Sequence, residues 1–190
     1  MKPYYDRDGI TIYHGDCREV LPTLAPVDLV LTDPPFAVSV VGSTALDGTR
    51  NLDFFKGDDD WPAMVAAVQE GLMAACDRLT PTGSLYAWVG HRSFGGLVAA
   101  LEARGLSTRF LVWAKKCPVP PAPGAGWPSG AELCVYAYPS GRTWTCREGP
   151  PRSNVIVADS YRHGQPGKVA HPTQKPPAVV VPLIGVSTVK

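Results

Sequence analysis

A short apolar strand that runs into two consecutive prolines constrains this 190-residue chain more than any other feature. The apolar run Val27–Thr32 predicts a buried strand, and Asp33-Pro34-Pro35-Phe36 follows it directly. Proline has a fixed φ and no N–H, so the strand has to end in a stiff loop whose carbonyls are left open to other donors. Ligands of open α/β sheets bind at the carboxyl ends of strands. We therefore expect this loop to line a binding site.

The chemistry of this loop suits an exocyclic amino group on a flat ring. The Asp33 carboxylate and the Pro34 carbonyl can each accept a hydrogen bond from one of its two N–H groups. This favours a pyramidal nitrogen and frees the lone pair. Phe36 can stack on the ring, as aromatic side chains do on unstacked bases. The plainer alternatives are that Asp33 caps a turn and that Phe36 lies in the core.

A second segment, His171-Pro172-Thr173-Gln174-Lys175-Pro176, makes the pattern much more specific. In this order, the two segments resemble the catalytic motif and the start of the methyl-donor half of DNA adenine-N6 and cytosine-N4 amino-methyltransferases. The resemblance is to the permuted subclass, in which the catalytic half comes first. Three further segments also fit that family, namely Ile12–Cys17, Pro81–Tyr86 and Leu111–Lys115.

The resemblance implies a site-specific DNA methyltransferase that transfers a methyl group from S-adenosylmethionine to adenine N6. The base would be flipped out of double-stranded DNA, because a duplex hides its amino groups. The implied catalytic residues are Asp33, Pro34, Pro35 and Phe36. The implied donor-binding residues are Asp16, Cys17, Asp33, His171, Thr173, Gln174 and Lys175. Asp16 also suits the cap of a helix, and both roles can hold at once.

One departure from the family concerns the methyl donor. The strand and Asp-Pro-Phe-x-Gly-x-Gly turn expected after Pro176 do not occur in residues 177–190. The chain is then a fragment, or the element comes from elsewhere, or the enzyme is disabled, and we expect residues 1–190 to bind S-adenosylmethionine weakly. Three alternatives stay open: a cytosine-N4 methyltransferase, an inactive DNA-binding remnant, and a methyltransferase for a protein or RNA amine.

The order of predicted elements gives the fold class. Strands are predicted at 10–14, 27–32, 84–89, 108–114 and 132–138, and helices at 18–24, 60–79, 93–103 and 176–184. Their alternation favours a mainly parallel, doubly wound α/β sheet, and the resemblance implies a Rossmann-like methyltransferase sheet that is incomplete at the C-terminus. Irregular structure is predicted for 116–130 and 139–170, and a flap beside the site for 37–58.

The chain divides into three expected parts. Residues 1–138 would form the catalytic core, 139–170 a short target-recognition segment, and 171–190 the start of the donor-binding half. Residues 142–190 hold 7 basic and 2 acidic side chains, against 11 and 15 in residues 1–141. A basic segment of this kind suits a phosphate-tracking surface, although a solvated loop would look the same. The candidate DNA contacts are Arg142, Arg147, Arg152, Arg162 and Lys168.

Composition excludes several classes of protein. No apolar run is long enough for a membrane helix, and the first residues lack an apolar signal core. The five cysteines form no CxxC pair, which argues against a structural zinc site and favours reduced thiols in the cytoplasm. We therefore expect a cytoplasmic protein without a metal, whose partners are double-stranded DNA and either a restriction endonuclease or a second copy of the chain.

Overall fold

The computed structural model describes residues 2–34, 61–119, 126–142, 153–161, 167–169 and 173–188. Its strands are β1 (Tyr5–Arg7), β2 (Ile10–Ile12), β3 (Val27–Thr32), β4 (Leu79–Val89), β5 (Leu106–Val119), β6 (Ser129–Pro139) and β7 (Val155–Ala158). Its helices are α1 (Cys17–Val20), the 3-10 turn η1 (Leu21–Thr23), α2 (Trp61–Cys76), α3 (His91–Ala103) and α4 (Pro177–Gly185). Strands β1 and β2 form a separate antiparallel hairpin.

The main sheet has the strand order β3-β4-β6-β5-β7. Strand β3 is parallel to β4 and β5 is parallel to β7, whereas β6 is antiparallel to both of its neighbours. Four of these five strands therefore point the same way, but two of the four pairings are antiparallel, so the sheet is mixed and not mainly parallel as predicted. Strands β5 and β6 are separated by only nine residues, 120–128, whereas a parallel crossover needs a dozen or more, so the short connection suits the antiparallel pairing of β6.

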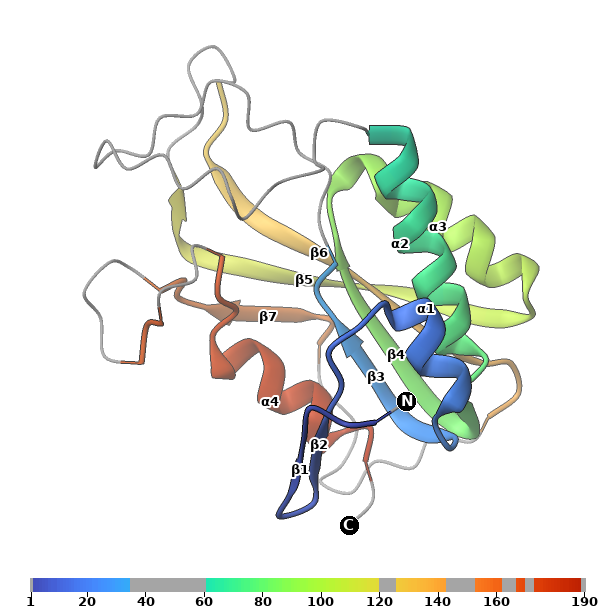
Figure 1. Ribbon diagram of the computed structural model, residues 1–190. Coiled ribbons are helices and arrows are strands. Elements are labelled where there is room, and N and C mark those ends of the chain that lie inside the picture. The colour runs from blue at the N-terminus through green and yellow to red at the C-terminus, as the bar shows by residue number, and fades with distance from the viewer. Residues whose placement is uncertain are drawn as a thin grey trace.

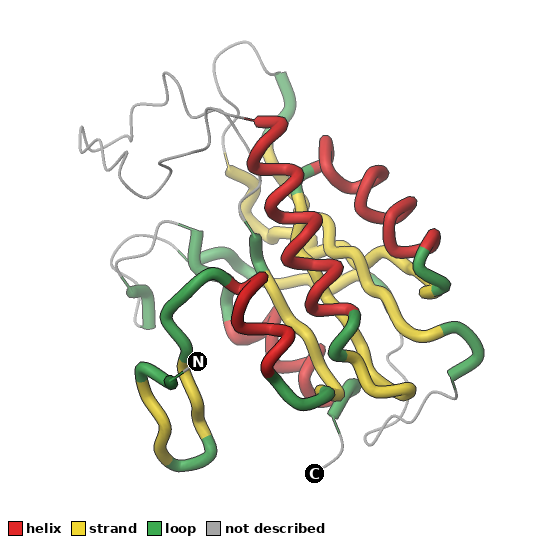
Figure 2. Tube along the Cα trace, turned by 45° about the vertical axis from the view of Figure 1, so that its right-hand side comes forward, coloured by secondary structure: helices red, strands yellow, loops and turns green. Residues whose placement is uncertain are grey.

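Helices cover both faces of this sheet, as predicted for a doubly wound fold (Figure 1). Successive side chains of a strand point to opposite faces, and β4 uses both. Leu85, Ala87 and Val89 pack in one core with side chains of α2 and α3. Tyr86 and Trp88 face the other way and pack against α4. Figure 2 shows α2 and α3 side by side over their face.

Several boundaries differ from the sequence prediction. Strand β3 has the predicted bounds, but β4 begins at Leu79, so that Thr80–Gly83 lie in the strand and not at a helix end. Strand β5 extends into the proline-rich stretch as far as Val119. Strand β6 begins inside that stretch, at Ser129. A register shift between Ala114 and Val119 marks where this stretch is accommodated. Such an irregularity tolerates Pro118, which has no N–H to donate to the ladder.

The prediction that residues 139–170 are wholly irregular is wrong. Val155–Ala158 forms β7 and pairs in parallel with β5. A single edge strand of β-branched residues carries a weak periodic signal, which explains why it was missed. The predicted flap at 37–58 lies outside the described residues. The helices of the described segments are too short or too polar to cross a bilayer.

Candidate active site

The predicted loop and the predicted second segment meet at the carboxyl end of β3. Asp33 leaves the strand just before Pro34, and its Oδ2 lies 2.8 Å from Nζ of Lys175. The two residues stand 142 positions apart in the sequence. The Asp33 side chain is 35% exposed and that of Lys175 is 10% exposed. The contact therefore joins an accessible carboxylate to an almost buried ammonium group.

Helix α4 fixes the position of Lys175. Pro176 stands at its N-cap with extended backbone, and Val179 and Leu183 are buried against the Tyr86 and Trp88 face of the sheet. Lys175 directly precedes this helix, and its Nζ lies 5.5 Å from the centroid of the Trp88 ring. A cation at this distance from an indole face is attracted by the ring quadrupole. Docking of α4 thus delivers the ammonium group to Asp33.

Glu132 is the site residue that sequence reasoning missed. Its Oε2 lies 3.0 Å from Lys175 Nζ, and its Oε1 lies 2.9 Å from Lys115 Nζ. Burial alone would raise the pKa of Glu132, but the charges of Lys175 and Lys115 together lower it below its ordinary value. The carboxylate is therefore held ionised between two cations. The available signal was Lys115, which lay inside a segment that resembled the family, but its contact depends on the pairing of β5 with β6.

Trp88 contributes a buried hydrogen-bond donor to this region. The side chain is buried, and its indole N–H finds no acceptor among the described residues. Burying a donor without a partner costs about 1–3 kcal/mol.

Asp16 caps α1, as one of its two predicted roles required. Its carboxylate accepts a hydrogen bond from the backbone N–H of Arg18 at 2.9 Å and pairs with the Arg18 guanidinium. Hydrogen bonds from Arg18 lower the pKa of Asp16 to about 2. Arg18 also reaches Glu70 of α2 at 2.8 Å. The Sγ of Cys17 lies 3.0 Å from where a Cβ on Gly71 would stand, so α1 packs closely on α2.

Gln174 ties the second segment to the preceding loop. Its Oε1 accepts from the backbone N–H of Val169 at 2.8 Å, and its Nε2 donates to the carbonyl of Gly167 at 3.0 Å. Thr173 is exposed beside it, and Lys168 is half-buried in the tied loop. The predicted residues Pro35, Phe36, Arg147, Arg152, Arg162 and His171 lie outside the described residues.

Solved structures of similar fold exist for most of the chain, although no family model matches it. The complex of M1.HpyAVI with SAM has a TM-score of 0.64 and 19% identity, over 93% of this chain and 76% of that chain. The PvuII DNA methyltransferase, described as cytosine-N4-specific, has a TM-score of 0.62 and 18% identity, over 98% of this chain and 73% of that chain. This chain has a methyltransferase fold.

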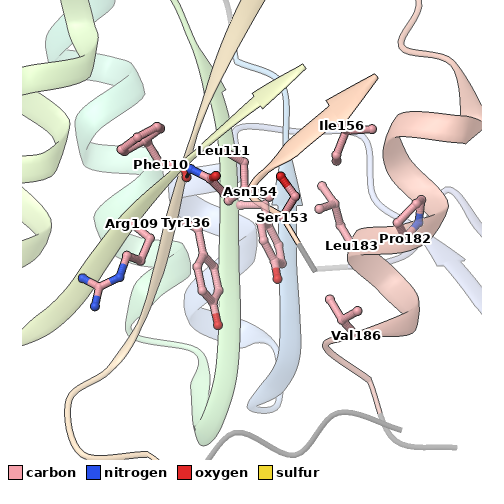
Figure 3. A pocket seen from close by; sticks show the side chains of 11 residues that line it. Arg109, Phe110, Leu111, Tyr136, Ser153, Asn154, Ile156, Pro182, Leu183 and Val186 are labelled. Atoms are coloured by element: carbon pink, nitrogen blue, oxygen red, sulfur yellow. Dashed lines mark hydrogen bonds between the residues drawn. The ribbon is translucent and has the colours of Figure 1, made fainter. Parts of the chain in front are cut away.

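Within this methyltransferase fold, a pocket of about 450 Å³ lies at the other end of α4 from Lys175. Leu183 of α4 and Val186, which caps the C-terminus of α4, line it opposite Tyr136 of the sheet (Figure 3). The ion pairs of Asp33, Lys175 and Glu132 are not part of its lining. The charged chemistry is thus at the carboxyl edge of β3, where open α/β sheets bind ligands.

Arg142, predicted as a DNA contact, is held inside the methyltransferase fold. Its Nη1 donates to the carbonyls of Thr82 and Gly83, at 2.9 and 2.6 Å, and to Oγ of Ser84 at 2.8 Å. Its Nη2 donates to the hydroxyl of Tyr136. Ser84 pairs with Leu29 at the amino half of β3, away from Asp33. The guanidinium therefore joins the chain after β6 to the start of β4.

Arg142→Ala is expected to destabilise the protein in the absence of any DNA. The change leaves several carbonyl and hydroxyl acceptors without their charged donor, at a cost of about 2–3 kcal/mol, and thermal unfolding should show a clearly lower Tm. Arg109→Ala serves as the control, since Arg109 is exposed and its guanidinium donates to the carbonyl of its neighbour Thr108. An unchanged Tm in Arg142→Ala would contradict the structural role.

Proposed function

We propose that this chain is the catalytic region of a DNA methyltransferase that uses S-adenosylmethionine and methylates adenine N6 of a flipped-out base. One observation carries the proposal: Asp33 of the first predicted motif and Lys175 of the second lie 2.8 Å apart at the carboxyl edge of β3. The similar folds of the PvuII DNA methyltransferase and of M1.HpyAVI bound to SAM support it.

The residues around Lys175 fit the methyl donor. Lys175 is a compact cation that suits the carboxylate of the methionine moiety. The Asp33 carboxylate, the more exposed of the two carboxylates around Lys175, suits a positively charged sulfonium. S-adenosylmethionine, when bound, supplies a methyl group activated on sulfur. The other residues assigned to the methyl donor, namely Asp16, Cys17, His171, Thr173 and Gln174, remain proposals.

Asp33 and Pro34 act on the target nitrogen. The Asp33 carboxylate and the Pro34 carbonyl each accept a hydrogen bond from one N–H of the amino group, so that its lone pair points at the incoming methyl carbon. Asp33 need not be a strong base, because a proton can leave after the nitrogen has become cationic. Such positioning supplies up to about 7–11 kcal/mol of barrier reduction. Phe36, next to Pro35, would stack on the extruded base.

Cytosine N4 is the second candidate target. The similarity in fold to a cytosine-N4-specific enzyme favours it, whereas the Asp-first form of the loop favours adenine by resemblance. Both reactions use the same acceptors, since each target is an amino group conjugated with a ring. DNA is favoured over a protein or RNA amine by the basic balance of residues 142–190.

The test is to identify the methylated base. Excess protein is incubated with duplex DNA of mixed sequence and saturating S-adenosylmethionine carrying a labelled methyl group, and the digested DNA is analysed by mass spectrometry. We expect labelled N6-methyladenine from the unaltered chain and none from Asp33→Ala. Detection of labelled N4-methylcytosine instead would show that the target base is cytosine and not adenine. Absence of label in both bases would contradict methyl transfer by this chain.

A further inference from the structure

We propose that Glu132 is a positioning residue for Lys175 and, through it, for the Asp33 carboxylate. The inference rests on the proposed function, because it assigns Glu132 a part in the same methyl transfer. Glu132 would not touch the base or the methyl group. It would set where the Lys175 ammonium stands, and that in turn sets how Asp33 is held.

Glu132 links two lysines through one ion pair with each. Each carboxylate oxygen faces a different ammonium group, Lys115 at 2.9 Å and Lys175 at 3.0 Å. The Lys115 side chain is 8% exposed and that of Glu132 is 20% exposed. Water therefore screens these charges much less than it screens surface pairs.

Each of the two lysines that contact Glu132 also lies over a tryptophan ring. Lys115 Nζ lies 5.3 Å from the Trp113 ring centroid, and Lys175 Nζ lies 5.5 Å from that of Trp88. The two indoles pack edge to face, with centroids 6.5 Å apart. Both rings are buried, so each lysine stem is confined between an indole and a carboxylate.

The order of charge along the cluster explains why Glu132 matters for position. The side chains alternate as Lys115, Glu132, Lys175 and Asp33, and two cations balance two anions. A lysine has a long stem with many rotamers, so one partner at the edge of a cleft leaves it considerable freedom. A carboxylate on each side of Lys175 removes that freedom. Asp33 is then presented to a substrate in one orientation.

A purely structural role would be for Glu132 to neutralise the buried Lys115. The two roles predict different behaviour when both charges are removed together. Lys115→Met with Glu132→Leu leaves the balanced pair of Lys175 and Asp33, and hydrophobic replacement of a buried ion pair is often neutral for stability. If neutralisation is the whole role, this double variant keeps the wild-type rate.

The decisive experiment compares two double variants in the methyl-transfer assay. We expect K115M/E132L to keep its Tm within a few degrees but to lose about 10- to 100-fold in kcat, as misplaced catalytic groups do. K115M/E132Q should recover part of that loss, because the amide oxygen of the new side chain can still accept from Lys175. Asp77→Asn is the matched control, since Asp77 pairs with Arg104 at 2.5 Å on the helical face of α2 and α3. A wild-type kcat in K115M/E132L would overturn the proposal.

A second readout does not depend on methyl transfer. Acetic anhydride acetylates accessible lysines, and mass spectrometry of digests gives the rate at each one. Lys175 should react about tenfold faster in K115M/E132L than in the unaltered chain, as expected for a lost ion-pair partner, with the exposed Lys116 as internal reference. An unchanged rate would refute the positioning of Lys175. If the unaltered chain transfers no methyl group, the proposed function and the part of Glu132 in methyl transfer fail, while acetylation still decides whether Glu132 positions Lys175.

Discussion

Asp33→Ala is expected to lower the rate of methyl transfer by about a thousandfold, because it removes the proposed hydrogen-bond acceptor for the nitrogen that becomes cationic. Asp33→Asn keeps an oxygen at this position but loses the charge, so its rate should fall between those of alanine and aspartate. Single-turnover rates with labelled donor give both values directly. Asp28→Asn is the matched control. Asp28 lies near the start of β3, at the opposite end from Asp33, and its carboxylate accepts a hydrogen bond from the hydroxyl of Thr80 at 2.8 Å.

The fold should survive the loss of Asp33. Lys175 keeps Glu132 as an ion-pair partner, and the Asp33 side chain is about one third exposed, so little of the site is left buried and uncompensated. Circular dichroism and Tm should therefore match those of the unaltered chain to within a few degrees. A rate for Asp33→Ala within tenfold of the unaltered chain would refute the catalytic role of Asp33.

Local sequence signals were sufficient for the parts of the site that lie on one strand end or one helix start. The apolar run before Asp33 gave β3 with its observed bounds, and Pro176 gave the start of α4. That the two segments lie together was implied by the resemblance. The structure agrees, since Asp33 contacts Lys175.

The parts that sequence could not predict depend on the pairing of distant strands. Glu132 reaches Lys115 because β6 runs antiparallel to β5 with Glu132 opposite Trp113. Side chains two positions apart on facing strands are diagonal neighbours, but this requires the register to be known. Arg142 was predicted to contact DNA on its charge alone, and its hydrogen bonds to the β4 backbone also follow from tertiary packing.

Helix α4 should control both the stability and the site, and Val179→Asp is expected to disrupt it. Val179 is fully buried against the sheet, whereas Val181 on the same helix is 60% exposed. A carboxylate at position 179 would be buried without a partner, which should cost at least about 4 kcal/mol in the free energy of unfolding. An aspartate at position 181 would face water, so Val181→Asp should change the free energy of unfolding by about 0.5 kcal/mol or less. Because both variants carry one aspartate in one helix, helix propensity and net charge cancel in the comparison.

The same pair of variants tests whether α4 delivers Lys175 to Asp33. If Val179→Asp detaches the helix, acetylation of Lys175 should speed up and methyl transfer should fall, while Val181→Asp leaves both unchanged. Urea denaturation monitored by tryptophan fluorescence gives the unfolding free energies, and the lysine and methyl-transfer assays give the rest. Equal stability of the two variants would mean that α4 does not pack on the sheet through Val179. The contact of Lys175 with Asp33 would then need another cause than helix docking.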